Sequence, residues 1–385
     1  MSYKITNNIV LGLILILGIY LSFTGGYGSD EDTLPMIGTF FGFQGGKFMT
    51  SRFTGYPVAE FIIGFFSYYF GSFLINLIIF LSLIAGSIIF YISLVKKIIW
   101  NDLALFLILL LSNPILFFEN LEPMDYSLAF LFFSLGYFFL NKDKIELSIV
   151  FFGICIGTRL NFAPLVIALI YFSKQEILKQ DFRRYSLILT SLFIGCLFYV
   201  PVWIHSGLEL DWLRAGRPEG NFFEYFTRFS YKLITTFGII QFIIIIFLFK
   251  NNFRKIINYK FIKLLFFLIL INLIIFLYIP AERSYLQPMI IFLYFILFIV
   301  LSKKYIYLLV SLNLITWFVN FDFINVKYKY DNICDPVQAV SAKIDLKYKE
   351  GYLYEFKKSR ELIKCWIDVD SEYGKKVLSG AALKK

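Results

Sequence analysis

Residues 24–60 read TGGYGSDEDTLPMIGTFFGFQGGKFMTSRFTGYPVAE, and three acids in this stretch, Asp30, Glu31 and Asp32, interrupt an otherwise apolar sequence. They follow directly on an apolar run at residues 9–23, so the chain places carboxylates where it leaves a membrane. Ionisable side chains at that depth are costly and usually functional. A solvated connecting loop is the alternative interpretation, because short runs of charge are common on surfaces.

The composition indicates a polytopic membrane protein. Of the 385 residues, 59% are hydrophobic and 17% are charged, whereas about 25% charged residues is usual in soluble domains. The net charge of +10 is more informative through its distribution over the loops than through its sum, so no nucleic-acid partner is expected. One His and four Cys without CxxC or HExxH spacing offer no ligand set for a built-in zinc ion.

The apolar runs predict an all-α fold with about eleven membrane-spanning helices. The expected spans are residues 9–23, 73–95, 103–118, 126–140, two short spans within 145–172, and then 186–205, 231–249, 264–279, 289–301 and 305–320. Residues 57–70 fall well short of the roughly 20 residues that a span needs. We therefore expect them to form a helix on the outer membrane surface, within a first outer loop over residues 24–72.

The run 145–172 is expected to break at residues 157–161, GTRLN. A glycine and the charge of Arg159 would be costly inside a continuous lipid-facing helix. With this break, the inner loops carry mainly Lys and Arg and the outer loops mainly Asp and Glu, as the positive-inside rule requires. The expected location is a bacterial cytoplasmic (inner) membrane, in which the chain is an integral, multi-pass protein.

The same topology divides the chain into a membrane domain over residues 1–320 and a small polar outer region over residues 321–385. Cys334 and Cys365 belong to this outer region. In an oxidising compartment these two thiols would be able to pair, but sequence separation says nothing about their geometry.

Charged side chains from distant parts of the sequence are expected on one face of the membrane. They are Asp30, Asp32, Glu122, Asp125, Arg159 and Arg283. A carboxylate at a membrane boundary can take a proton from an acceptor hydroxyl while guanidinium groups hold a phosphate leaving group. The plainer interpretation of the two arginines is that they anchor helix ends by extending to the membrane surface.

Several short motifs follow one another on this expected outer side. They are the acids at 30–32 with GYPV at 55–58, EPMD at 122–125, GICIGTR at 153–159 with NFAP at 161–164, and ERSYLQP at 282–288. In this order they resemble the C-type (GT-C) integral membrane glycosyltransferases, broadly the protein mannosyltransferase and aminoarabinose transferase kind. Each motif alone is weak. The chain departs from some relatives in having Tyr56 rather than His before Pro57.

The resemblance implies transfer of a hexosyl or pentosyl unit from a polyprenyl-phosphate sugar to a glycan, lipid or protein acceptor, with inversion at the anomeric carbon. It assigns the general base to Asp30 or Asp32, the orientation of the acceptor or a second acid to Glu122 and Asp125, and phosphate binding to Arg159, Arg283 and Tyr285. No cofactor is certain, and a divalent metal ion is compatible with these acids. Membrane lipids would surround the site, which would face outward.

A membrane transporter or a flippase of polyprenyl-linked intermediates is the main alternative function. Such proteins are expected to show paired repeats with broken helices and ionisable residues at mid-membrane, and the sequence shows no such repeat. A non-catalytic assembly subunit is the third hypothesis. Release of polyprenyl phosphate from a labelled lipid-linked sugar would distinguish the three.

Overall fold

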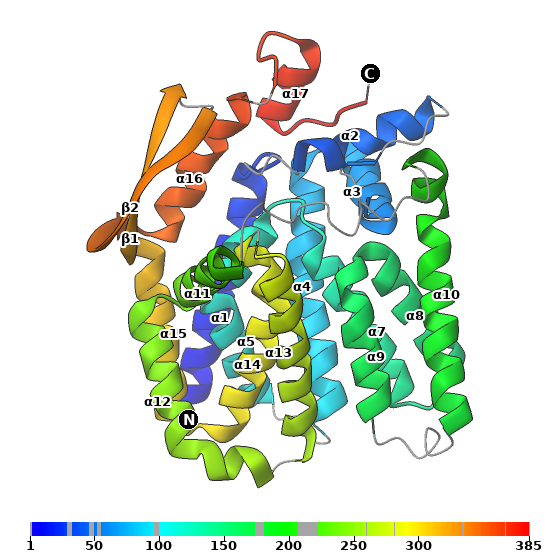
Figure 1. Ribbon diagram of the computed structural model, residues 1–385, viewed down its shortest axis with the longest axis vertical. Coiled ribbons are helices and arrows are strands. Elements are labelled where there is room, and N and C mark those ends of the chain that lie inside the picture. The colour runs from blue at the N-terminus through cyan, green and yellow to red at the C-terminus, as the bar shows by residue number, and fades with distance from the viewer. Residues whose placement is uncertain are drawn as a thin grey trace.

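The computed structural model consists mainly of helices that stand side by side (Figure 1). It describes residues 2–28, 33–45, 50–51, 55–95, 100–173, 181–206, 222–258, 260–280, 282–332, 335–365 and 367–384. Asp30, Asp32 and Cys334 lie outside the described residues, as does the side chain of Cys365. The predicted polytopic, α-helical fold is confirmed, and the C-terminal region adds a two-stranded ribbon.

The N-terminal part of the chain forms two long helices and two shorter ones. They are α1 (Ser2–Thr24), α2 (Thr33–Gln44), α3 (Pro57–Phe70) and α4 (Ser72–Leu94). Helix α3 has the predicted bounds, because Pro57 suits the first turn and Gly71 takes a φ of +84° that favours glycine. Helices α2 and α3 pack on each other and lie at the end of the bundle where α1 finishes (Figure 1).

The predicted single span over residues 103–118 is wrong in one respect, because it is broken. Helix α5 (Trp100–Ser112) is followed by α6 (Pro114–Phe118), and the two axes differ by 89°. Pro114 cannot continue α5, because proline lacks the N–H donor and its ring clashes with the preceding turn. Asn113 begins α6 instead, its side-chain oxygen accepting a hydrogen bond from the Leu116 N–H at 3.1 Å. The short 3-10 helix η1 (Glu119–Leu121) follows.

The next helices follow the prediction closely. Helix α7 (Tyr126–Leu140) has the predicted bounds, and the break after α8 (Ile145–Thr158) falls where Arg159 was expected to place it. The 3-10 helix η2 (Leu160–Phe162) then leads into α9 (Ala163–Phe172). Helix α7 packs between α4 and α8, and α8 packs on α10 (Asp181–Ser206). These contacts bring the loop ends that carry the expected outer residues together.

The predicted span over residues 231–249 also needs correction. Helix α11 (Phe222–Phe237) turns by 89° into α12 (Ile239–Asn258) at Gly238, whose φ is +78°. Helix α11 is strongly amphipathic. Phe222 and Phe223 in its first turn are exposed, whereas Thr236 and Phe237 in its last turn are buried. An amphipathic helix of this kind suits a membrane interface rather than a span.

Four helical segments complete the membrane part of the chain. They are α13 (Lys260–Tyr278), the 3-10 helix η5 (Arg283–Leu286), α14 (Gln287–Val300) and α15 (Lys303–Phe318). Buried polar side chains join α5, α14 and α15: Tyr294 accepts from Asn113 at 3.1 Å and donates to Asn313 at 3.2 Å, and Trp317 donates to the Ser112 carbonyl at 2.7 Å. Such bonds between helices fix their packing in an apolar medium.

The number of membrane spans stays a prediction. Within the described ranges, five helices are long and apolar enough to cross a membrane, or up to seven if each of the two bent pairs counts as one span. The expected eleven also includes the shorter helices α7, α8, α9 and α15, of 15, 14, 10 and 16 residues. Helices of this length span a bilayer where it is locally thinned or where flanking side chains extend to its surfaces.

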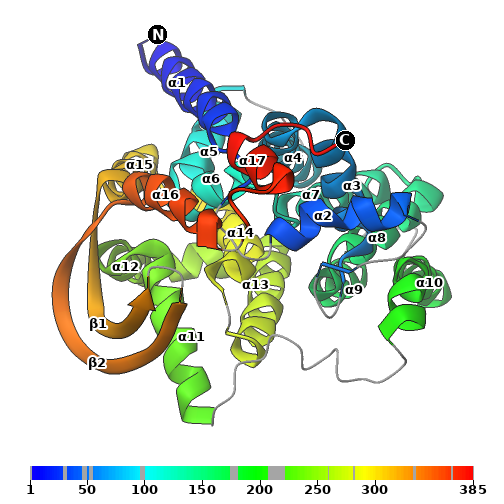
Figure 2. The ribbon, with the colours of Figure 1, turned by 90° about the horizontal axis from the view of Figure 1, so that it is seen from above.

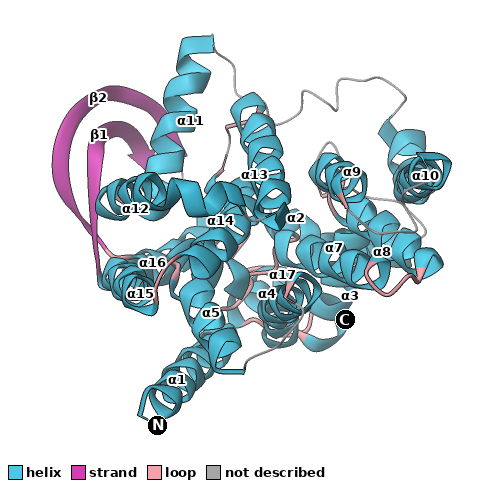
Figure 3. Cartoon of the chain, turned by 90° about the horizontal axis from the view of Figure 1, so that it is seen from below, coloured by secondary structure: helices cyan, strands magenta, loops and turns pink. Residues whose placement is uncertain are grey.

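The C-terminal region forms a ribbon and then returns to the bundle. Its elements are β1 (Val319–Asn332), β2 (Asp335–Glu350), α16 (Tyr352–Leu362), the 3-10 helix η6 (Ile363–Cys365) and α17 (Glu372–Ser379). The antiparallel ribbon pairs Val319 with Glu350 at its base and arches past α12 (Figures 2 and 3). Helix α17 lies over the end of the bundle near α2 and α4 (Figures 1 and 2).

The residues after α17 are tied to the turn between α3 and α4. The Ser72 N–H donates to the Gly380 carbonyl at 2.9 Å, and the Leu383 N–H donates to the Ser67 carbonyl at 3.2 Å. Leu383 is buried with the side chains of the first outer loop, and Phe356 from α16 is buried in the main core. The C-terminal region therefore shares its cores with the membrane helices.

Candidate active site

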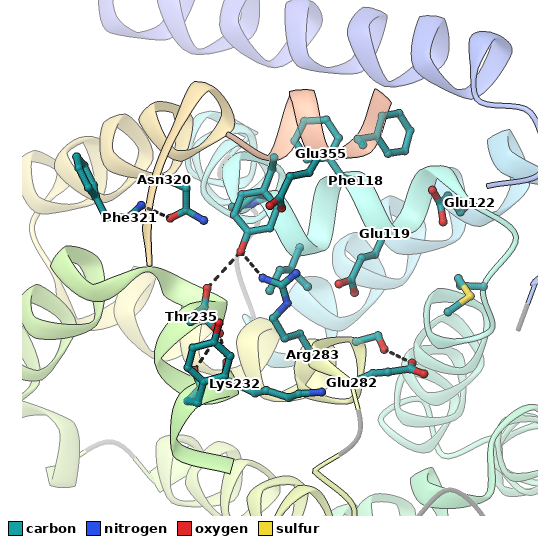
Figure 4. Close-up of a pocket in the computed structure, with 17 residues that line it drawn as sticks. Phe118, Glu119, Glu122, Lys232, Thr235, Glu282, Arg283, Asn320, Phe321 and Glu355 are labelled. Carbon is teal, nitrogen blue, oxygen red and sulfur yellow. Dashed lines mark hydrogen bonds between the residues drawn. The ribbon is translucent and has the colours of Figure 1, made fainter. Parts of the chain in front are cut away.

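A cavity of about 510 Å³ opens where α6, η1, α11, η5 and the C-terminal region meet. Its wall combines aromatic rings with charged side chains (Figure 4). The charged ones are the carboxylates Glu119, Glu122, Glu282 and Glu355 and the cations Lys232 and Arg283. Because acids and cations converge on one cavity, this is the strongest candidate site among the described residues.

Arg283 stands at the start of η5 and is half-buried. Its Nη1 donates a hydrogen bond to the hydroxyl of Tyr352 at 2.9 Å, and its guanidinium lies 5.4 Å from the centre of that ring. The Tyr352 hydroxyl in turn donates to the Thr235 carbonyl of α11 at 3.2 Å. Figure 4 shows Arg283 pointing into the space between Glu119 and Thr235. The Tyr352 hydroxyl thus directs the guanidinium into the cavity, near the carboxylates of Glu119 and Glu355.

Lys232 reaches the cavity from α11, on the other side of the space from the η1 acids (Figure 4). It stands one helical turn before Thr236, on the buried side of that amphipathic helix. Two cations from different elements therefore line the same cavity. That arrangement suits an anionic group such as a phosphate.

Hydrogen bonds orient the acids of the wall. Glu119 accepts from the Gln287 side-chain amide at 3.1 Å, and Glu282 accepts from the Ser284 hydroxyl at 3.0 Å. Glu122 is 8% exposed and lies at the edge of the cavity nearest the first outer loop.

The two residues that flank the acidic segment 29–32 contact the turn that holds Glu122 and Met124. A Cβ atom on Gly28 would stand 2.8 Å from the Glu122 Oε2, and the φ of Gly28 is +85°, so glycine is required there. On the other side of the segment, the Thr33 hydroxyl contacts the Met124 sulfur at 3.9 Å. Asp30 and Asp32 themselves lie outside the described residues.

Asp125 and Arg159 form a second charged group, away from the cavity wall. Asp125 is 0% exposed and Arg159 is 1% exposed, and their Oδ1 and Nη1 atoms form an ion pair. Asp125 precedes the first turn of α7, and Arg159 stands in extended conformation in the break between α8 and η2. The Asp125 Oδ2 and the Arg159 Nε have no hydrogen-bond partner within the described ranges.

Three tyrosine rings surround this buried guanidinium. Its central carbon lies 3.4 Å from the ring centre of Tyr126, 4.9 Å from Tyr285 and 5.0 Å from Tyr56. Cation–π contacts of this kind stabilise a desolvated cation. One arginine therefore joins the first outer loop, the start of α7, the α8–α9 break and η5.

The residues expected to act together are thus split between two neighbouring groups. Glu122 and Arg283 line the cavity, whereas Asp125 and Arg159 form the buried pair. Tyr285 connects the two groups, because it follows Arg283 closely in η5 and contacts the Arg159 guanidinium.

Sequence reasoning missed several side chains of the cavity. They are Glu119, Lys232, Glu282, Tyr352 and Glu355. Glu119 lies close to the motif EPMD at 122–125, and Glu282 begins the motif ERSYLQP at 282–288. Their closeness to these motifs could have identified both acids as site residues. No such signal marked Lys232, Tyr352 and Glu355 in the sequence. The position of Lys232 depends on the bend after α11, and that of Tyr352 and Glu355 on how α16 returns to the bundle.

A divalent ion finds no ready ligand set within the described ranges. No group of three or more His, Cys, Asp or Glu side chains there is arranged to hold a metal.

The fold and the gathered loop charges define a polytopic α-helical membrane protein with the architecture of the C-type (GT-C) glycosyltransferases. A solved structure with this fold is ArnT from Cupriavidus metallidurans, crystallised in the apo state. The match has a TM-score of 0.52 and 14% sequence identity, and it covers 78% of this chain and 61% of ArnT. At this identity the likeness shows the fold alone, which confirms the expected fold. No protein-family model and no curated protein sequence matches the chain significantly.

Proposed function

We propose that this protein is a glycosyltransferase that moves a sugar from a polyprenyl-phosphate donor to a hydroxyl of a glycan, lipid or protein acceptor. The observation that carries the proposal is the cavity in which Arg283 and Lys232 converge opposite the carboxylates of η1 and its following turn. Cations suit the phosphate of the donor, and carboxylates suit the hydroxyl groups of sugars. The GT-C-type fold supports the same chemistry by analogy.

In this proposal the donor phosphate binds between Arg283 and Lys232. A guanidinium offers a planar fork that matches phosphate oxygens, whereas the ammonium group of a lysine acts as a point charge. The expected contact of Arg159 with the phosphate stays a prediction. The Arg159 guanidinium is paired with Asp125 and enclosed by tyrosine rings. We therefore propose that the main role of this pair and of Tyr285 is to hold the cavity wall in place.

The reaction is a single displacement at the anomeric carbon. A carboxylate removes the proton of the acceptor hydroxyl, the acceptor oxygen bonds to the anomeric carbon, and the bond from that carbon to the phosphate oxygen breaks. The electron pair of the broken bond stays on the phosphate, where the two cations stabilise it. Attack opposite to the leaving group inverts the configuration.

We propose Asp30 or Asp32 as the general base and Glu122 as the residue that orients the acceptor. The support is indirect: Gly28 and Thr33, which flank the acidic segment, contact Glu122 and Met124 at the cavity. Asp30 is our first choice, because it is nearer to α1 and so to the membrane boundary. The base must come within hydrogen-bond reach of the acceptor hydroxyl.

The site is proposed to face outward from a bacterial inner membrane. The support is the loop charge, since within residues 1–320 the predicted inner loops carry 16 of the 24 lysines and arginines. The amphipathic helix α11 would lie in the outer interface, where its exposed Phe222 and Phe223 contact lipid.

The purified protein in lipid nanodiscs, given polyprenyl-phosphate donors that carry radiolabelled hexoses or pentoses, tests the function. We expect release of polyprenyl phosphate and loss of release in Arg283→Ala, with full release in Lys304→Ala, which removes an exposed cation at the start of α15. A flippase would instead move a fluorescent polyprenyl-phosphate sugar across proteoliposomes without cleaving it. Transport without cleavage by any donor would overturn the proposal.

A further inference from the structure

The C-terminal helix α16 supplies one wall of the cavity. Tyr352, Glu355 and Phe356 all line it, and their i, i+3, i+4 spacing places them on one face of the helix. Phe356 anchors that face, because its ring packs against Phe118 with centroids 5.3 Å apart. The wall is therefore built by residues from a part of the chain that the sequence assigned to a separate outer region.

The turn before α16 determines where Tyr352 stands. A Cβ atom on Gly351 would lie 2.3 Å from the carbonyl carbon of Phe318, the last residue of α15. Only glycine allows this approach, so α16 starts directly against the end of α15. Tyr352, which is 8% exposed, is consequently fixed at the edge of the cavity.

The Tyr352 hydroxyl joins two elements that carry cations. A phenol has one hydrogen to donate, and this hydrogen bonds the Thr235 carbonyl of α11 at 3.2 Å. A lone pair then accepts from the Arg283 Nη1 at 2.9 Å. The hydroxyl therefore sets the direction of the Arg283 guanidinium relative to α11, which also carries Lys232.

The two arginines of the site differ in what holds them. Arg159 is paired with the carboxylate of Asp125, which neutralises its charge. Arg283 donates to the neutral hydroxyl of Tyr352, which fixes the direction of the guanidinium, and the carboxylates of Glu119 and Glu355 also act on its charge. The guanidinium therefore points into the cavity, where an anionic ligand can reach it.

We propose that Tyr352 is a positioning residue for Arg283, and that the C-terminal region is thereby part of the phosphate-binding site. This inference rests on the proposed function, in which Arg283 binds the donor phosphate. The ligand class is a prenyl monophosphate, recognised through its headgroup.

The test compares farnesyl phosphate with farnesol as probes, titrated calorimetrically into the full-length protein in detergent. Tyr352→Phe keeps the ring and its packing but removes the hydroxyl. We expect farnesyl phosphate to bind about three- to tenfold more weakly, as befits one lost hydrogen bond, while farnesol binding is unchanged. Tyr354→Phe is the matched control on the same helix, since Tyr354 is 49% exposed and does not line the cavity.

Arg283→Ala separates this inference from the proposed function. If Tyr352 acts through Arg283, adding Tyr352→Phe to Arg283→Ala will cause no further loss of farnesyl phosphate affinity. Normal farnesyl phosphate binding by Tyr352→Phe, or an equal loss of farnesol binding, would overturn the positioning role even if Arg283→Ala binds farnesyl phosphate more weakly. Normal binding by Arg283→Ala would instead remove the phosphate site from the proposed function.

Discussion

Arg159 and Asp125 form a fully buried ion pair, although 34 residues separate them in the sequence. Through this pair the start of α7 is attached to the break between α8 and η2, next to the tyrosines of the first outer loop and η5. Burying two charges carries a large desolvation cost. Removal of one partner destabilises a protein more than replacement of both partners by apolar side chains, because it leaves one buried charge uncompensated.

Removal of one partner of this pair should therefore destabilise the protein strongly. We expect Asp125→Ala to lower stability by about 3–5 kcal/mol, because it leaves a buried guanidinium without a counter-charge. The double variant Asp125→Leu with Arg159→Met should recover most of the loss. Thermal unfolding in detergent measures both, with Glu372→Ala as an exposed control. A Tm of Asp125→Ala equal to that of the unaltered protein would contradict the structural role.

Lys232 should contribute to headgroup affinity independently of Arg283. Loss of a charge-assisted contact of about 1.5–3 kcal/mol predicts roughly ten- to a hundredfold weaker binding of farnesyl phosphate by Lys232→Ala. Lys232→Arg should retain most of the affinity, whereas Arg283→Lys should not, because lysine lacks the planar fork. Equilibrium titration checks these values, and undiminished affinity in Lys232→Ala would exclude it from the phosphate site.

The acids of the first loop should affect turnover rather than donor binding. Loss of a general base typically costs about a hundredfold to ten-thousandfold in rate. We therefore expect either Asp30→Asn or Asp32→Asn, made separately, to reduce transfer by that factor with unchanged affinity for the lipid phosphate. Glu122→Gln should raise the acceptor KM more than it lowers kcat. If both Asn variants keep near-normal turnover, the loop is a connector and the proposed mechanism is wrong.

The orientation of the chain is tested by cysteine labelling. In a background with the native cysteines replaced by serine, Glu372→Cys in α17 and Lys142→Cys in the turn after α7 each present an exposed thiol. An impermeant maleimide should label Glu372→Cys in intact cells and Lys142→Cys only after permeabilisation. The reverse pattern would invert the predicted topology.

The attachment of the C-terminal residues to the first outer loop should contribute to stability. The Tyr27 hydroxyl lies 2.8 Å from the Ala381 carbonyl and 3.0 Å from the Ser67 carbonyl. Burial, with a smaller effect of Tyr373, raises the pKa of Tyr27, so the hydroxyl stays protonated and able to donate. Tyr27→Phe should cost about 1 kcal/mol, visible as a lower Tm. A greater loss is expected for Gly71→Val, since a Cβ there would stand 2.7 Å from the Gly380 carbonyl oxygen. Unchanged Tm in both variants would mean that the contact is not stabilising.

Much of the helical framework followed from the sequence. The bounds of α3 and α7 and the break at Arg159 were predictable, because a lipid environment requires every backbone N–H and C=O to be paired within helices. Proline, glycine and a charge marked these helix ends in the sequence. The same signals at Pro114 and Gly238 lay inside long apolar runs, and their bends became apparent only from the packing of neighbouring helices.

The sequence by itself determined that this is a membrane protein with acids and arginines at its loops, because hydropathy and charge are local properties. Tertiary structure alone decided which of those charges meet. Arg159 forms a buried ion pair with Asp125, away from the cavity. Arg283 instead points into the cavity, where it donates a hydrogen bond to Tyr352, 69 residues further along the chain. The physical reason is that side-chain pairing depends on how helices rotate and where a polar tail returns, and neither leaves a periodic pattern in the sequence.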